Sequence, residues 1–168
     1  GRLEVINSLL ENTKKHGTLP FAGLARAGFI AVQLLQSLVN KGVFTGKDYD
    51  RFMTSCCTIS TRIAKDKIRL CKEKFLKKYG HLRPGTYNIS SPRYDEEPDL
   101  YFDWAANDKV KKVSRFCLTT RQKNDITQLI HDSGLSIDAK SLIFFIKTAI
   151  EYREFAKFLF TRNLSDCL

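Results

Sequence analysis

The chain has 168 residues, of which 43% are hydrophobic and 27% charged, and its net charge is +10. This composition suits one compact domain with a hydrophobic core and excludes a disordered chain. No apolar run is expected to reach the roughly 20 residues that span a bilayer, and no segment has the pattern of a signal peptide. We therefore expect a soluble, cytoplasmic protein that does not enter a membrane.

The first 42 residues predict two helices. Residues 2–15 place Leu3, Ile6, Leu9 and Leu10 on one face, and Gly17 is typical of a C-terminal stop. A second helix is expected to begin near Pro20 and run to Gly42. It is apolar nearly all round, which favours a place at the buried centre of a bundle.

Arg26 is the only charged residue of this second helix before residue 41. A buried guanidinium needs a carboxylate, a phosphate or several carbonyl groups around it. The sequence leaves two interpretations open: a structural ion pair with the acidic residues of 94–99, or an anion contact in a pocket.

A third helix is expected from Gly46, capped by Thr45. Its predicted inner stripe is Phe52, Cys56, Ile59, Ile63 and Ile68. Residues 80–100 contain three prolines, which exclude a regular helix there. A connection of this length in a compact domain is either functional or disordered, and its tyrosines and histidine favour an ordered loop.

Two helices are predicted after this loop. One covers about residues 119–133 and ends before Gly134, and the last follows from a cap at Ser136. No alternating strand pattern is present. The sequence predicts an all-α fold, a single domain over residues 1–168 with five or six helices in a bundle and one long ordered loop that contains prolines.

The charge is arranged in blocks. Residues 61–80 carry eight Lys or Arg, residues 94–108 carry six acids and no base, and residues 109–123 carry six bases and no acid. An acidic block between two basic ones does not suit a surface that follows a phosphate backbone. Nucleic acid is therefore an unlikely partner.

The cysteines and histidines show no metal-binding or nucleophile spacing. The five cysteines (Cys56, Cys57, Cys71, Cys117 and Cys167) include no C-x-x-C pair, so we expect reduced and mostly packed thiols. His16, His81 and His131 lie in no metal motif, and no phosphate-binding glycine loop is present. We expect no metal and no cofactor in this chain.

His81, Arg83 and Tyr87 lie close together in the proline-restrained loop. Such a set can hydrogen-bond an oxyanion or a hydroxyl-rich substrate, or it can tie the loop to the bundle. Arg153 and Lys157 in the last helix have the same two interpretations, since they lie either on a solvated face or beside a partly open site flanked by phenylalanines.

Three stretches resemble one family: "GTLPFAGLARAGFIAVQLLQSLV", "FLKKYGHLRPGTYNISSPRYDEEP" and "EYREFAKFLFTRNLSD". They are similar to the middle region of phosphoenolpyruvate synthase/pyruvate phosphate dikinase-like proteins, and more closely to a bacterial branch found with surface-polysaccharide genes. The "YGH-x-x-PG" core also resembles the helical substrate domain of rifampicin phosphotransferases. The resemblance covers nearly the whole chain.

This resemblance implies a fragment of a larger phosphotransferase. In that family an ATP-grasp domain uses ATP and Mg to phosphorylate a histidine on a swivelling domain, which carries the phosphoryl group to an acceptor. Neither domain is expected in this chain, so the isolated fragment should be inactive. Its loop would form one wall of the site for a small-molecule acceptor or phosphorylated intermediate. The candidate binding residues are Arg26, His81, Arg83, Tyr87, Arg93, Arg153 and Lys157.

The chain departs from the family pattern at two places, Asn88 and the segment around Cys56 and Cys57. Asn88 stands where an Asp is usual, which leaves the acceptor open. Two other classes also stay open: a non-catalytic helical interaction module and a nucleic-acid binder that uses the basic residues of 61–78.

Overall fold

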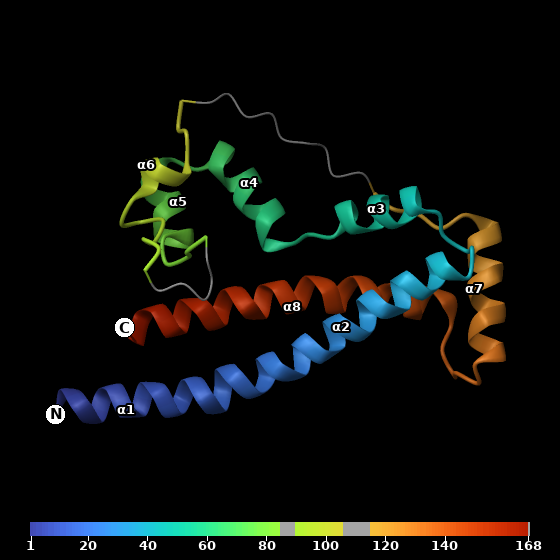
Figure 1. Ribbon diagram of the computed structural model, residues 1–168, viewed down its shortest axis with the longest axis horizontal. Coiled ribbons are helices and arrows are strands. Elements are labelled where there is room, and N and C mark those ends of the chain that lie inside the picture. The colour runs from blue at the N-terminus through green and yellow to red at the C-terminus, as the bar shows by residue number, and fades with distance from the viewer. Residues whose placement is uncertain (85–89, 106–114, 168) are drawn as a thin grey trace. The chain divides into compact units, whose positions relative to one another are not determined.

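The computed structural model describes residues 1–84, 90–105 and 115–167, with the backbone alone described for residues 163–167. Helices make up 74% of the described residues, which contain no strand, so the all-α prediction is confirmed. The elements, shown in Figure 1, are α1 (Arg2–Asn12), the π-helical turn η1 (Thr13–Thr18), α2 (Leu19–Asn40), α3 (Gly46–Ser55), α4 (Ile59–Arg69), α5 (Lys72–Tyr79), α6 (Pro98–Tyr101), α7 (Thr120–Asp132) and α8 (Ala139–Cys167).

The predicted break between the first two helices is wrong. α1, η1 and α2 form one continuous helical stretch, Arg2–Asn40, in which Gly17 and Pro20 both lie. A π turn supplies the extra residue at the junction, and Pro20 is accommodated near the start of α2. His16 consequently lies inside the stretch and not at a helix end.

α2 is not buried all round, contrary to the sequence analysis. Its buried residues, Gly28, Ala31, Leu35 and Leu38, form one face, whereas Phe29 and Ile30 are exposed. The α1 residues expected on an inner face are exposed as well, Leu3 to 81%. The stretch Arg2–Asn40 has a window of mean hydropathy 1.4, so it is long and apolar enough to cross a membrane. Core helices of soluble proteins and signal sequences have the same length and composition. The expectation that no segment reaches this length was therefore wrong.

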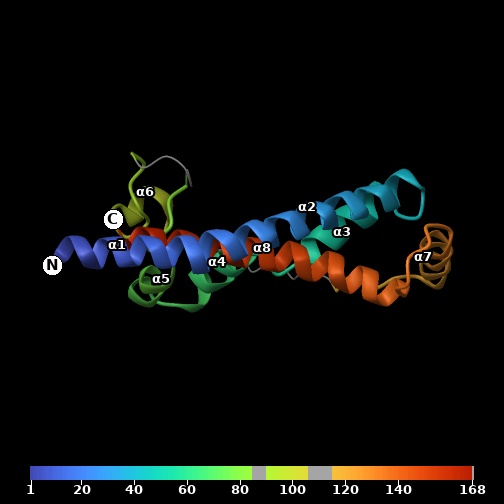
Figure 2. The ribbon, with the colours of Figure 1, turned by 90° about the horizontal axis from the view of Figure 1, so that it is seen from below.

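The chain divides into two compact units, which are described separately; Figures 1 and 2 draw its helices from two directions. Unit 1 consists of Gly1–Ala22, Thr58–Lys111 and Glu154–Leu168, and unit 2 of Gly23–Cys57 and Lys112–Arg153. Each unit has a buried cluster of its own. The expectation of one domain over residues 1–168 stays a prediction.

The core of unit 2 is mainly aliphatic and comes from α2, α3, α7 and α8. Its fully buried members include Leu35, Phe52, Ile126 and Ile146. Gly42, with φ of +73°, turns the chain at the end of α2, and Gly134, with φ of +65°, ends α7 as predicted. The last helix begins at Ala139, and its cap is Asp138 and not the predicted Ser136. Asp138 Oδ1 accepts the backbone N–H of Ser141 at 2.8 Å.

The core of unit 1 is aromatic. Phe75, Tyr79 and Phe158 are buried, and Phe102, Trp104 and Phe155 pack against them. The Phe75 ring lies 5.1 Å from the Tyr79 ring and 5.1 Å from the Phe102 ring, between centroids. The predicted single stripe from Phe52 to Ile68 is therefore wrong: Phe52 and Cys56 belong to the unit 2 core, Ile59 and Ile63 pack in unit 1, and Ile68 is exposed.

Candidate functional site

The loop that follows α5 is closed at its base by its own backbone. The Tyr94 N–H donates to the Leu82 carbonyl at 2.9 Å, and the Asp95 N–H donates to the Gly80 carbonyl at 3.2 Å. Gly80 has no room for a side chain, since an added Cβ would lie 2.4 Å from the Leu76 carbonyl oxygen. The two arms, residues 80–84 and 90–95, are thus held together where the loop leaves α5.

Arg83 and Arg93 both contact the loop itself. An Nη1–H of Arg83 donates to the Ser91 carbonyl at 2.8 Å, across the two arms. Arg93 binds the Asp95 carboxylate with two donors, Nε to Oδ1 at 2.8 Å and Nη2 to Oδ2 at 2.5 Å. These contacts join parts of the loop to each other and not to the bundle, and bidentate guanidinium–carboxylate pairs are among the stronger polar contacts. The anion-binding roles expected for Arg83 and Arg93 stay predictions.

His81 is buried in unit 1, with 9% of its surface exposed. Its ring packs edge-on against Phe158 of α8, with the centroids 4.9 Å apart. The imidazole therefore connects the start of the loop to α8 within unit 1, and the binding role expected for His81 stays a prediction.

Tyr79, next to the loop, belongs to a polar network that the sequence analysis missed. The Asp66 carboxylate accepts hydrogen bonds from Lys78 Nζ at 2.6 Å and from the Tyr79 hydroxyl at 2.8 Å. Burial by itself would raise the pKa of Asp66, but these two hydrogen bonds outweigh it and lower that pKa. Burial, together with the hydrogen bond to Asp66, raises the pKa of Tyr79. The spacing of Asp66 and Lys78 along the chain gave no signal for this contact.

The other candidate residues are divided between the two units. Lys157 is half-buried on α8 in unit 1, whereas Arg26 and Arg153 belong to unit 2. Arg26 is exposed, so the expectation of a buried guanidinium was wrong. Tyr87 lies outside the described residues, as does Asn88. A single cleft shared by all these residues stays a prediction.

Arg153 packs against α2 within unit 2. Its guanidinium carbon lies 4.7 Å from the centroid of the Phe29 ring, and its aliphatic stem covers Gly28. This is a cation–π contact that also covers a glycine on the partner helix. No signal in the sequence indicated that Arg153 fills the space beside Gly28.

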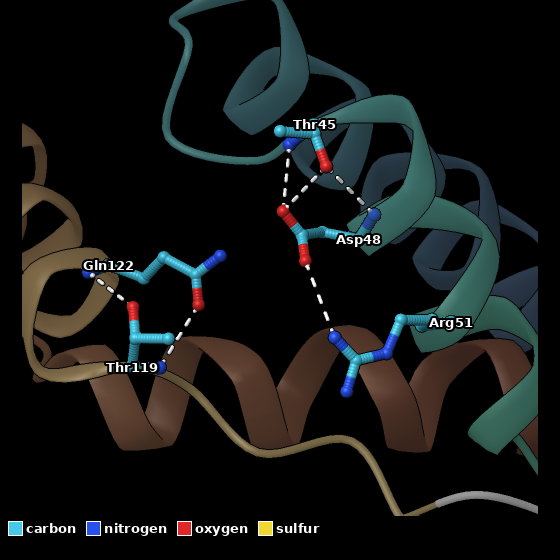
Figure 3. A network of polar contacts seen from close by, with 5 residues as sticks. All are labelled: Thr45, Asp48, Arg51, Thr119 and Gln122. Carbon is cyan, nitrogen blue, oxygen red and sulfur yellow. Dashed lines mark hydrogen bonds and ion pairs between the residues drawn. The ribbon is translucent and has the colours of Figure 1, made fainter.

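Unit 2 contributes two helix caps at its polar surface, drawn in Figure 3. The Thr45 hydroxyl accepts the Asp48 N–H at 3.1 Å, and Asp48 Oδ2 accepts the Thr45 N–H at 3.0 Å. Thr119 and Gln122 make the equivalent pair at α7. These residues start helices, and Asp48 Oδ1 also lies 3.9 Å from Arg51 Nη1.

The cysteine prediction is corrected in part. Cys56 is buried, but Cys57, Cys71 and Cys117 are exposed, and all four are free thiols. Cys56 ends α3 and Cys57 follows it, so the pair does not lie within a helix. In the described part of the chain, no three or more His, Cys, Asp or Glu side chains lie together in a way that could hold a metal ion.

Comparison of the chain with protein-family models, with curated proteins and with solved structures finds no match.

Proposed function

We propose that this chain is the helical acceptor-site domain of a phosphotransferase that resembles phosphoenolpyruvate synthase. One observation supports the proposal: parts of the three stretches that carry the resemblance, among them Phe21 of the first, pack together within unit 1. Phe160 stacks on Phe21 with ring centroids 5.5 Å apart, and Phe158 contacts the rings of Tyr79 and His81. Stretches far apart in a sequence that pack together at one point are typical of a shared structural unit.

In this proposal the buried residues of the motif position the loop, and its cations meet the substrate. His81 is packed on Phe158, so its role is to hold the loop and not to carry a phosphoryl group. Arg83 has the planar guanidinium that recognises phosphate or carboxylate, and because its Nη1 donates to the Ser91 carbonyl, an anion would compete with that carbonyl. Arg93 is already paired with Asp95, so an anion that binds there competes with that carboxylate.

The proposal places the remaining chemistry outside this chain. ATP and Mg²⁺ would be bound by an ATP-grasp domain, and a phosphohistidine domain would deliver the phosphoryl group to a small-molecule acceptor. Both domains would belong to the same parent enzyme, which would work in the cytoplasm. Residues 1–168 alone should therefore retain no label after incubation with γ-labelled ATP, and label on His16, His81 or His131 would contradict the proposal.

The decisive test is Arg83→Ala in the parent enzyme. We expect phosphoryl transfer to fall at least about tenfold, which is roughly 1.4 kcal/mol of transition-state stabilisation. Arg83→Lys should recover only part of this loss, because an ammonium cannot reproduce two parallel donors. The melting temperature is the control, since Arg83 also bridges the loop: unfolding of the Ala variant would assign the residue a structural role only.

A helical interaction module is the second candidate, and exposed apolar side chains favour it. On α1, Leu3, Val5 and Ile6 are 81%, 60% and 43% exposed. Apolar groups gathered on one helix are common where a partner docks. A parent protein with full phosphotransferase activity in the Arg83→Ala variant would favour this module over the acceptor-site domain.

A further inference from the structure

A pocket of about 470 Å³ lies in unit 1, over α6 and the residues after it. Six consecutive residues line it: Asp99, Leu100, Tyr101, Phe102, Asp103 and Trp104. Its volume lies within the roughly 300–1,000 Å³ of small-molecule sites. None of these residues takes part in the acceptor site proposed above.

The aromatic wall of this pocket is fixed by packing. The Phe102 ring lies 4.8 Å from the Tyr94 ring and 5.3 Å from the Trp104 ring, between centroids. Trp104 also packs edge-on against the buried ring of Phe75, at 5.5 Å. The pocket is therefore a preformed surface on the aromatic core and not a gap between loose side chains.

An ammonium group of the protein already contacts two of the lining residues. Lys72 Nζ, at the start of α5, lies 2.6 Å from Asp99 Oδ1 and 5.4 Å from the centroid of the Trp104 ring. A carboxylate and an indole face around one ammonium are the two partners that organic cations prefer. The contacts of Lys72 therefore indicate that Asp99 and Trp104 can bind an ammonium group.

Lys72 balances only one of the two carboxylates that line the pocket, Asp99 and Asp103. Asp99 is paired with the ammonium, but Asp103 has an exposed carboxylate whose Oδ1 accepts the Ala105 N–H at 2.9 Å. Among the described groups, the two carboxylates of Asp99 and Asp103 and the one ammonium of Lys72 leave an excess of one negative charge, which favours a second cation over an anion.

The indole Nε1 of Trp104 is buried and is not exposed at the pocket. It makes no hydrogen bond of normal geometry within the described part of the chain. The Asp99 carboxylate is close enough that its pKa is lowered mainly by Lys72 and, to a smaller extent, by this indole.

We propose that the Asp99–Trp104 pocket binds a primary ammonium group on an alkyl chain, either a small free amine or a lysine side chain of a partner. The ammonium would pair with the carboxylates of Asp99 and Asp103, and its alkyl chain would lie on the aromatic wall. Lys72 competes for Asp99, so its displacement accompanies tight binding. The site is independent of phosphoryl transfer.

Trp104 is the one tryptophan in the sequence, so tryptophan fluorescence reports on this pocket and the aromatic core beside it. We would titrate the 168-residue chain with n-butylammonium and with Nα-acetyl-lysine N-methylamide, using the Nε-acetylated form of the latter as the neutral control. Saturable changes with both cations at equal affinity indicate a free-amine site, and tighter binding of the lysine amide indicates a peptide partner. An equal response to the neutral control, or no saturable response, overturns the proposal.

Three variants distinguish specific binding at this pocket from non-specific attraction between charges. Asp99→Asn should weaken binding at least about tenfold, and because the Asp99 side chain is 73% exposed, its melting temperature should not change. Lys72→Met removes the competing ammonium and should strengthen binding severalfold, whereas Lys74→Met, at an exposed position of the same helix, should change nothing. Unchanged binding in Asp99→Asn, or loss of binding in Lys72→Met, overturns the proposal.

Discussion

Gly28 lies on α2 where the stem of Arg153 packs against the helix. A Cβ added at Gly28 would lie 2.6 Å from Arg153 Cδ and 3.0 Å from Arg153 Cβ. The long side chain can move its outer part, but its Cβ is fixed to the backbone of α8. Overpacking of this kind typically costs about 1–3 kcal/mol.

We predict that Gly28→Ala is less stable than Gly23→Ala by about 1–3 kcal/mol. Both changes raise helix propensity by roughly 1 kcal/mol, but Gly23 is on the same helix with no atom within 4 Å of its added Cβ. Chemical denaturation of the two variants measures the difference directly. Equal stability would mean that Arg153 moves aside without cost.

Cys56 and Cys57 are neighbours in the chain with different surroundings. Cys56 is fully buried, and this burial, with the Glu151 charge nearby, raises the pKa of its thiol to about 11. Thiolate is the reactive form, so a thiol with this pKa is almost entirely unreactive at neutral pH. Cys57 is exposed, and its backbone N–H donates to Glu151 at 2.7 Å.

We predict that iodoacetamide at about pH 8 alkylates Cys57, Cys71 and Cys117 in the folded protein well before Cys56, because a buried thiol is both inaccessible and protonated. Peptide mapping by mass spectrometry gives the rate at each site. Denatured protein is the control, in which Cys56 should react like the others. Equal rates at Cys56 and Cys57 in the native state would contradict the buried position.

The caps of α3 and α7 differ in one titratable group. Asp48 in the α3 cap accepts hydrogen bonds from the Thr45 backbone and hydroxyl, and these lower its pKa below 3.8. Since the folded-state pKa is lower than the unfolded value, the stabilisation is complete above about pH 4 and is lost as the pH falls through the folded-state pKa. The α7 cap, made by Thr119 and Gln122, has no such group.

We therefore predict that Asp48→Asn lowers the melting temperature at pH 7 and that this difference shrinks below about pH 3. Thr119→Ala should lower stability by about 1 kcal/mol with no comparable pH dependence, because a hydroxyl cap does not titrate in this range. Thermal unfolding followed by circular dichroism at several pH values compares the two. A loss in Asp48→Asn that is the same at every pH would show that the carboxylate charge contributes nothing.

The caps also show which element boundaries the sequence could predict. Thr45 and Thr119, and Gly42 and Gly134 at helix ends, are local signals, and the structure places helix boundaries at or beside each of them. Gly17 and Pro20 are the same kind of signal, yet the helix runs through them. Phe160 packs on Gly17 and Phe21, so the tertiary contact and the π turn outweigh the local preference there.

The division of the core could not be read from hydrophobic periodicity. Phe52, Cys56, Ile59 and Ile63 follow one helical period, but the chain breaks at residues 56–58 and sends the two halves into different cores. Periodicity reports which residues are buried, not which neighbours cover them. The same limit applies to the candidate site. The sequence could indicate that the loop carries His81, Arg83 and Arg93. It could not indicate that Arg93 pairs with Asp95 or that His81 packs on Phe158, because those contacts depend on the folded chain.

The net charge of +10 makes nucleic acid a partner to consider for the whole molecule. Several lysines and arginines of α4 and α5 are exposed, among them Lys65, Arg69, Lys74 and Lys77. Others are used internally, since Lys72 binds Asp99 and Lys78 binds Asp66, each at 2.6 Å. Internal pairing removes part of the charge that a phosphate backbone would otherwise meet.

We predict that the chain binds nucleic acid at physiological salt no more tightly than non-specific proteins do, with Kd in the range of about 10⁻⁴–10⁻⁶ M. Fluorescence anisotropy with labelled single- and double-stranded oligonucleotides over several salt concentrations measures this. Lys74→Glu with Lys77→Glu should reduce the slope of log K against log salt by about 2, because each exposed lysine neutralises one phosphate. Submicromolar binding with a preference for one sequence would instead make nucleic acid a true partner, and the exposed face of α4 and α5 its binding surface.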